Sequence, residues 1–152
     1  MIKPTARIHI DATPAEVIGF IADPANAPRW MRALEVSELI TSGPIGVGSR
    51  FREVQSAGGR RIETICEVVE LDPERRYAWR SVGDAEAHYG GGFTATLASS
   101  GGTNLVYEGW ATTTGRLAAR EAAWARQAQR EAESELAAIK AAIEESLDRQ
   151  LV

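Results

Sequence analysis

The sequence contains very little cysteine and no long apolar run. Cys66 is its single cysteine, so no internal disulfide can form, and this agrees with a reducing compartment. No stretch of about eighteen apolar residues is present to span a bilayer. Residues 1–12 have neither an apolar signal core nor a small-residue cleavage site. We therefore expect a cytoplasmic protein without stable membrane insertion.

A basic surplus is also lacking. The 152 residues include 17 Lys and Arg against 21 Asp and Glu, a formal net charge of −4. Proteins that bind the phosphate backbone normally carry an excess of positive charge, so nucleic acid is not an expected partner. The hydrophobic fraction of 44% is typical of a globular protein. The chain length is typical of one domain, which we expect to cover residues 1–152.

Sequence motifs of common catalytic and metal sites are missing. There is no Gly-x-Ser-x-Gly, no His-Glu-x-x-His and no Cys-x-x-Cys. The glycines of residues 43–48, "GPIGVG", lead into a strand pattern, which is the wrong context for dinucleotide binding. Asp84, Glu86 and His88 alternate, but polar alternation near a hairpin is typical of a solvated face. We expect no metal and no cofactor.

What the sequence does contain is an ordered series of periodic segments. Residues 6–12, "ARIHIDA", alternate as a half-buried strand does. Residues 13–23 have helical spacing, and Thr13 with Glu16 forms a capping box. Residues 34–113 show six further strand patterns separated by turn residues. The short connections predict antiparallel neighbours.

The last quarter of the chain has the pattern of one long amphipathic helix, from about Leu117 to Asp148. A helix of roughly thirty residues is about 45 Å long and must cross the whole sheet. Its apolar stripe is bulky near the C-terminus and consists of alanines near the N-terminus, among them Ala122 and Ala125. The small side chains predict that volume is left over beside them.

Four motifs occur along this series in a characteristic order. They are "ATPAEVIGFIADPANAPRW" at 12–30, "GPIGVGSRFRE" at 43–53, "VVELDPERRYAWR" at 68–80 and "GGTNLVYEG" at 101–109. Together with the order of strands and helices, they resemble the polyketide cyclase/dehydrase branch of the START-like, or Bet v 1-like (SRPBCC), superfamily. The resemblance covers nearly the whole chain.

The resemblance implies an α+β helix-grip fold. A seven-stranded curved antiparallel sheet would wrap around the long C-terminal helix, with two short helices after the first strand and an apolar cavity between them. Members of the superfamily bind or transform lipids, polyketides, aromatic compounds or hormones. Their pocket chemistry varies, so the resemblance assigns no catalytic residue by position.

Trp30 and Met31 occupy an unusual place for two large apolar side chains. Pro24 and Pro28 prevent the segment around them from forming one long helix. In proteins that this chain resembles, the segment closes one end of the concave face of the sheet. Trp30 is then either a ligand contact with an indole N–H to offer or a plug of the core, and both readings stay open.

Strand alternation nominates the other residues of a cavity. For residues 87–97 the sequence leaves two alternatives for the side that faces the cavity. One is the set His88, Gly90 and Gly92, and the other is the set Tyr89, Gly91 and Phe93. The predicted ligand-binding residues are Trp30, Met31, Phe51, Thr64, Cys66, Tyr77, Trp79, Phe93, Ala122 and Ala125. The candidates for acid–base chemistry beside a carbonyl group are Glu53, His88, Tyr77 and Tyr107.

The long helix has a charge distribution that opposes its dipole, with basic residues in its first half and acidic residues in its second. One explanation is pairing with charges at the sheet edge. The other is that Arg116 and Arg120 flank a portal and attract an acidic ligand head group.

Three classes of function fit these observations. The first is binding of a small hydrophobic molecule in the cavity, as a carrier or sensor. The second is a polyketide cyclase/dehydrase that uses acid–base residues there. The third is a protein-interaction module of co-chaperone type, which would use the outer sheet face or the acidic helix end. A homodimer remains open as the oligomeric state.

Overall fold

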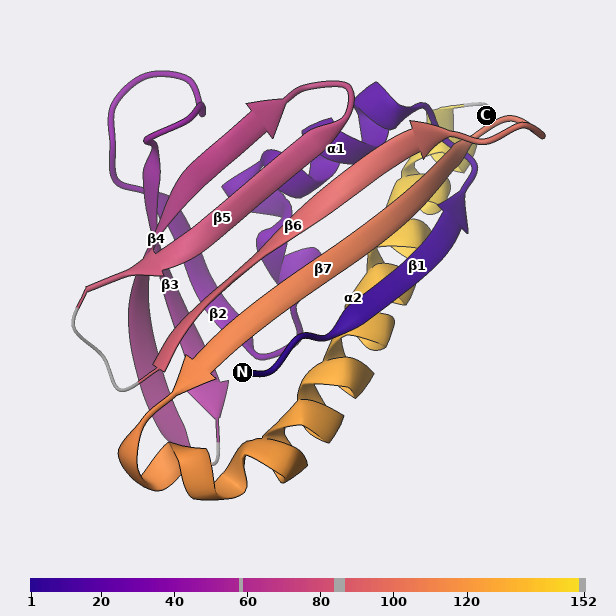
Figure 1. Ribbon diagram of the computed structural model, residues 1–152. Helices are drawn as coiled ribbons and strands as arrows, with labels where there is room; N and C mark the ends of the chain where they lie inside the picture. The colour runs from indigo at the N-terminus through magenta and orange to yellow at the C-terminus, as the bar shows by residue number, and fades with distance from the viewer. Residues whose placement is uncertain (58, 84–86, 151–152) are drawn as a thin grey trace.

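The chain folds into a seven-stranded antiparallel sheet with its helices on one face (Figure 1). A computed structural model describes residues 1–57, 59–83 and 87–150. The strands are β1 (Thr5–Ile10), β2 (Leu34–Leu39), β3 (Arg50–Ala57), β4 (Arg60–Asp72), β5 (Arg76–Val82), β6 (Ala87–Leu97) and β7 (Thr103–Thr113). The helices are α1 (Pro14–Ala22), the 3-10 helices η1 (Pro24–Arg29) and η2 (Gly115–Arg120), and α2 (Glu121–Gln150). This arrangement confirms the predicted helix-grip fold.

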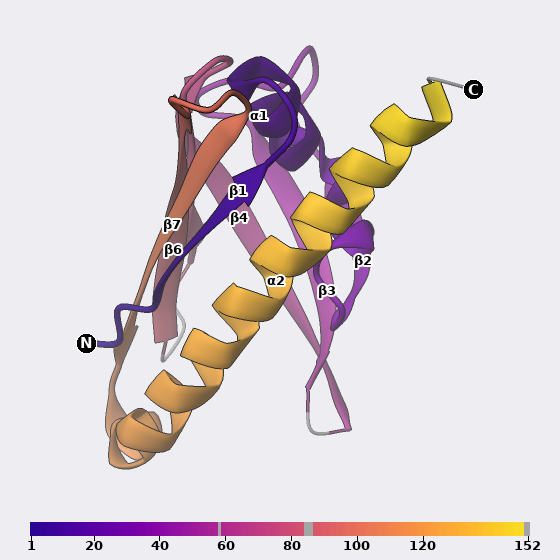
Figure 2. The ribbon, with the colours of Figure 1, turned by 90° about the vertical axis from the view of Figure 1, so that its right-hand side faces the viewer.

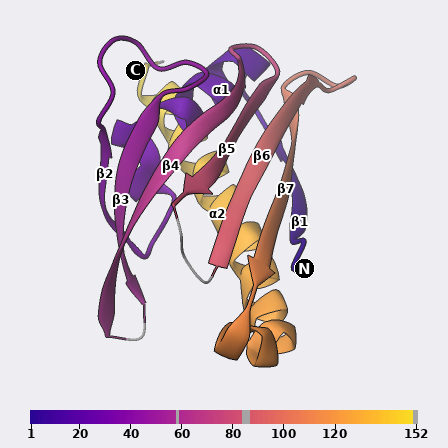
Figure 3. The same cartoon turned by 60° about the vertical axis from the view of Figure 1, so that its left-hand side comes forward.

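The sheet has the strand order β1-β7-β6-β5-β4-β3-β2, and all neighbours are antiparallel. From β2 to β7 each strand pairs with the next one along the chain, as the short turns predicted. β1 lies at the edge beside β7. Figure 3 views the sheet from its outer face, with the helices behind it. The inner face, toward the helices, carries the core.

The two short helices follow from local capping. Thr13 caps α1 by accepting a hydrogen bond from the amide of Glu16 at 3.2 Å, as the capping box predicted. Asp23 caps η1 in the same way through the amide of Ala25 at 3.0 Å. Pro28 lies inside η1, and Trp30 follows directly as its C-cap. The proline therefore limits the segment to a short 3-10 helix that places Trp30 against the sheet.

The long helix α2 packs mainly along β1, with fewer contacts to β7, α1 and η1. Figure 2 shows it crossing the inner side of the sheet diagonally beside β1. It begins later than predicted, because Gly115–Arg120 forms η2. Its buried residues belong to the predicted stripe and its neighbours: Ala132, Leu136, Ile139, Ala142 and Ile143. None of the helices in the described ranges is long and apolar enough for a membrane span.

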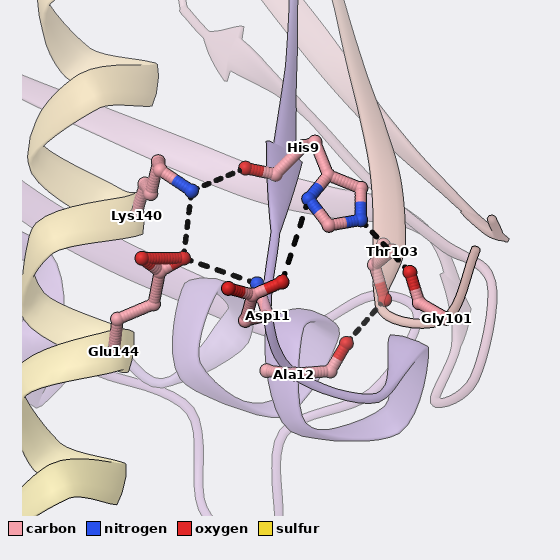
Figure 4. A network of polar contacts seen from close by, with 7 residues as sticks. All are labelled: His9, Asp11, Ala12, Gly101, Thr103, Lys140 and Glu144. Carbon is pink, nitrogen blue, oxygen red and sulfur yellow. Dashed lines mark hydrogen bonds and ion pairs between the residues drawn. The ribbon is translucent and has the colours of Figure 1, made fainter.

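A polar network holds the C-terminal half of α2 to the end of β1 (Figure 4). The ammonium group of Lys140 donates to the carbonyl oxygen of His9 and to the carboxylate of Glu144, both at 2.7 Å. The same carboxylate accepts from the amide of Asp11 at 3.0 Å. Below it, the buried hydroxyl of Thr103 donates to the carbonyl of Ala12 at 2.7 Å. This part of the helix is thus fixed by polar bonds as well as by its apolar stripe.

The structure resolves which side of β6 faces the core. Phe93 is almost fully buried in the inner cluster. Gly91 lies beneath the ring of Tyr107, on the same face as Phe93. Gly90 lies on the outer face, beneath the indole of Trp110. The inner set is therefore Tyr89, Gly91 and Phe93.

Replacement of Gly90 by alanine is expected to destabilise the sheet. A Cβ atom at this position would lie 2.6 Å from the backbone carbonyl oxygen of Trp79 and 2.9 Å from the Trp110 indole. A backbone atom cannot move aside without shifting β5. We expect Gly90→Ala to lower the free energy of unfolding by about 1–3 kcal/mol, measured by urea denaturation.

Gly19→Ala is the matched control, since a Cβ atom there, within α1, meets no atom within 4 Å. The same substitution should raise the free energy of unfolding by about 0.5–1 kcal/mol through helix propensity. A Gly90→Ala protein as stable as the parent would contradict the close packing of β5 and β6.

Candidate functional site

A small cavity lies on the inner face of the sheet, beneath α1 and η1. It measures about 20 Å³, room for about one water molecule. The helical segments contribute apolar side chains and the sheet contributes aromatic and polar ones. The lining residues are Ile21, Ala22, Pro24, Ala27, Trp30, Met31, Ser37, Phe51, Glu53, Tyr77 and Trp79.

Glu53 supplies the carboxyl group of this cavity. It lies in β3, opposite Ser37 of β2 and Thr64 of β4, and its exposed fraction is only 5%. The Gln55 amide donates to its carboxylate at 3.3 Å. Burial raises the pKa of Glu53 to about 7, while the bond from Gln55 acts in the opposite direction. This carboxyl group can therefore gain or lose a proton near neutral pH.

Aromatic rings line the cavity beside the carboxyl group and extend from it along the inner face. The Trp30 ring contacts Phe93 edge-on, with 5.8 Å between the ring centroids. Phe93 in turn lies 4.9 Å from the ring of Tyr107. On the other side, Trp79 contacts Tyr89 at 5.7 Å, again edge-on. The inner face of β5, β6 and β7 thus carries two groups of contacting aromatic rings, and Trp30 and Trp79 bring one ring of each group to the cavity.

The other titratable side chains of the inner face remain neutral. Burial raises the pKa of the Cys66 thiol and of the Tyr77, Tyr89 and Tyr107 hydroxyls above their usual ranges, and Glu53 adds to the shift for all but Tyr107. A thiol with a raised pKa is a poor nucleophile. Cys66 is therefore suited to packing, and the tyrosines to hydrogen bonding in their neutral form.

A second carboxyl group approaches from α2. Burial, together with the carboxylates of Glu131 and Glu53, raises the pKa of Glu135 to about 8. Glu135 also adds to the raised pKa of Tyr107. No ion pair to Glu53 or Glu135 is found among the described residues. The interior is acidic and is held in a largely protonated state by desolvation.

Most of the residues predicted from the sequence lie on this inner face. Those that line the cavity are Trp30, Met31, Phe51, Tyr77 and Trp79, together with Glu53. Thr64, Cys66, Phe93 and Tyr107 share the same face without lining the cavity. Trp30 is part of the buried core and also lines the cavity, and its contact with a ligand stays a prediction.

Other predicted residues lie elsewhere. His88 lies on the outer face, in an open depression shared with Arg80 and Trp110, and is not part of the cavity. Ala122 is exposed and Ala125 half-buried in the first turns of α2, at the opposite end of the molecule from α1 (Figure 1).

The portal residues lie at that distant end as well. Arg120 is exposed at the end of η2, far from the cavity beneath α1 and η1. The side chain of Arg116 lies outside the described part of the chain, as do Asp84 and Glu86.

Three polar residues of this interior were not among the predicted site residues: Ser37 and Tyr89 of the sheet and Glu135 of α2. Tyr89 belonged to one of the two alternative inner faces of β6. Only the packing of β6 against β5 and β7 decides which face points inward. Ser37 lies in a short strand, and a single serine there does not by itself predict a site residue. Glu135 lies within the acidic half of the long helix, where its charge looks like part of a solvated face.

Three solved structures show how widely this fold is shared. TTHA0849 from Thermus thermophilus has a TM-score of 0.79 and 20% identity, covering 95% of this chain and 98% of that one. The Zhui aromatase/cyclase from a Streptomyces species has a TM-score of 0.75 and 19% identity, covering 95% and 94%. The di-domain ARO/CYC protein BexL has a TM-score of 0.75 and 23% identity, covering 95% of this chain and 47% of that one.

At these identities the likeness shows the fold alone. No curated protein matches the chain in sequence. A family model, in contrast, matches residues 1–144. The chain therefore belongs to the family described as polyketide cyclase / dehydrase and lipid transport, which confirms the START-like resemblance of its motifs.

Proposed function

We propose that this protein binds a small hydrophobic molecule, such as a lipid, a polyketide or an aromatic compound, between the sheet and η1, and acts as a carrier or sensor. The observation that carries the proposal is the cavity of the inner face, where apolar and aromatic side chains surround Ser37 and Glu53. Such a lining, with a few polar groups that fix orientation, is typical of small-molecule sites. The family description, which includes lipid transport, agrees with this role.

Binding requires that η1 moves away from the sheet, because about 20 Å³ cannot hold a molecule of this size. Two side-chain hydrogen bonds hold η1 to α1 and α2. Asn26 donates to the carbonyl of Phe20 at 3.2 Å, and Arg29 to the hydroxyl of Ser146 at 3.5 Å. Outward movement of η1 would break these two bonds and the packing of Trp30 on Phe93, and would enlarge the cavity at Trp30 and Met31.

A cyclase or dehydrase activity in the same cavity is the second candidate. It is favoured by Glu53, whose pKa of about 7 suits a general acid or base at neutral pH. Tyr77 lines the same cavity as a neutral hydroxyl that could donate a hydrogen bond to a substrate oxygen.

Ligand binding should be visible at two of the four tryptophans. Naphthalene-sized aromatic compounds and long-chain alcohols, added one at a time to ¹⁵N-labelled protein, should shift the indole N–H signals of Trp30 and Trp79, because both residues line the cavity. The signals of Trp110, on the outer face, and Trp124, at the start of α2, serve as internal controls. Native mass spectrometry of the same samples gives the stoichiometry.

A ligand that shifted all indole signals alike, or only that of Trp110, would contradict the proposed cavity. Absence of any bound molecule, both after purification and with the added compounds, would favour a protein partner instead.

The stability of the protein should fall as pH rises through neutrality. Because the pKa of Glu53 is raised from 4.5 to about 7, its stabilising contribution is complete below about pH 4.5 and is lost as pH rises through about 7. Glu53→Gln removes this loss. We expect the variant to be more stable than the parent by up to about 3 kcal/mol at pH ~9, and by much less at pH ~5, in urea denaturation.

Glu135 remains in that variant, so a smaller decline with pH should persist. The exposed Glu74 of the β4–β5 turn provides the matched control, and Glu74→Gln should leave the pH dependence of the parent unchanged. Identical pH profiles for the Glu53→Gln variant and the parent would show that Glu53 is ionised in the folded protein.

A further inference from the structure

The cavity holds hydrogen-bonding groups that no described residue of the protein satisfies. Trp30 Nε1 and Ser37 Oγ are buried side-chain atoms with no hydrogen-bond partner among the described residues. Trp30 has an exposed fraction of 5%, and both residues line the same cavity. Buried polar atoms without partners are rare in folded proteins. An indole N–H can only donate, so the missing partner of Trp30 is an acceptor.

Glu53 completes this polar end of the cavity. Its register position is directly opposite Ser37, across the β2–β3 pair. The titratable groups that interact with it are Cys66 of β4, Tyr77 of β5, Tyr89 of β6 and Glu135 of α2. α1 and η1 contribute only Ile21, Ala22, Pro24 and Ala27 to the lining, and none of the lining residues is a cation.

These surroundings decide the protonation state of Glu53. Without a cation, and with burial as the main cause of a pKa of about 7, the carboxyl group carries a proton below neutral pH. A protonated carboxyl group is a hydrogen-bond donor. Trp30 and Glu53 then present two donors to a space of about one water molecule, with the Ser37 hydroxyl able to donate or accept beside them.

We propose that Trp30, Ser37 and Glu53 form a binding site for the carbonyl oxygen of a hydrophobic ligand, with the indole N–H and the protonated Glu53 carboxyl as donors. A carbonyl oxygen has two acceptor positions and no proton, which matches two donors. A ligand hydroxyl would bring a third proton into the same space. The site rests on the proposed function and specifies its ligand as a ketone or a similar carbonyl compound.

The proposal fixes the sign of a pH dependence. The hydrogen bond from Glu53 to the carbonyl oxygen requires the proton on the carboxyl group, and an ionised carboxylate would repel the partly negative oxygen. With the titration midpoint at about 7, the Kd of a ketone should rise about three- to tenfold between pH ~6 and pH ~9, because this hydrogen bond is lost. A ligand that has the same ring system without the oxygen should show no such change.

The test compares 1-tetralone, 1-tetralol and tetralin, which share one skeleton and differ in the oxygen. Their affinities are measured by calorimetric titration of the full chain at both pH values. We expect 1-tetralone to bind about three- to tenfold more tightly than tetralin at the lower pH, as one or two hydrogen bonds allow. The preference should disappear at the higher pH.

Two substitutions separate the donors. Glu53→Gln retains an N–H donor but cannot titrate, so 1-tetralone should bind it about equally at both pH values. Trp30→Phe retains an aromatic ring but removes the N–H. It should weaken the binding of 1-tetralone about three- to tenfold and leave the affinity for tetralin unchanged. Trp110→Phe, on the outer face, is the matched control and should change neither affinity.

Each alternative result has a clear meaning. Equal, pH-independent binding of all three compounds would overturn the carbonyl site and leave the hydrophobic cavity standing, with a buried water as the partner of Trp30. Tighter binding of 1-tetralol, increasing with pH, would assign the site to a hydroxyl and overturn the proposal. Failure of all three to bind would overturn both the site and the proposed function.

Discussion

The position of α2 along β1 is the constraint on which the rest of the structure depends. Its apolar stripe and the bonds from Lys140 and Glu144 fix it to one edge of the sheet. The inner faces of the other strands need a different cover. α1 lies against β5 and β6, and η1 against β2. The cavity is therefore found beneath two short segments, which are easier to displace than a 30-residue helix.

Much of this fold could be predicted from the sequence, because strand alternation and turn chemistry act locally. The capping pair Thr13 and Glu16, the inward-facing Cys66 and the bulky apolar stripe in the C-terminal half of the long helix appear as predicted. The side of β6 could not be predicted, since one face carries His88 with two glycines and the other carries Tyr89 and Phe93 with one. Only the neighbouring strands decide it, through the rings of Trp110 and Tyr107 that cover Gly90 and Gly91.

The candidate site was predictable only in part, for a related physical reason. Glu53 and the aromatic residues of β3 and β5 follow from alternation, which places them on one face. The location of the cavity does not, because it depends on where α2 lies. The alanines of α2 suggested spare volume beside Ala122, yet that turn of the helix lies beyond the cavity and is exposed. Small side chains create an internal cavity only where another surface faces them.

The proton on Glu53 links the two functions considered for this cavity. A neutral carboxyl group can hold a carbonyl oxygen through a hydrogen bond, and this is sufficient for a carrier. A cyclase or dehydrase would also have to transfer that proton during each turnover and recover it afterwards. Burial that brings the pKa of Glu53 to about 7 makes both states accessible. What separates carrier from enzyme is then the ligand: only a molecule with an acidic hydrogen, placed near the carboxylate, would turn binding into chemistry.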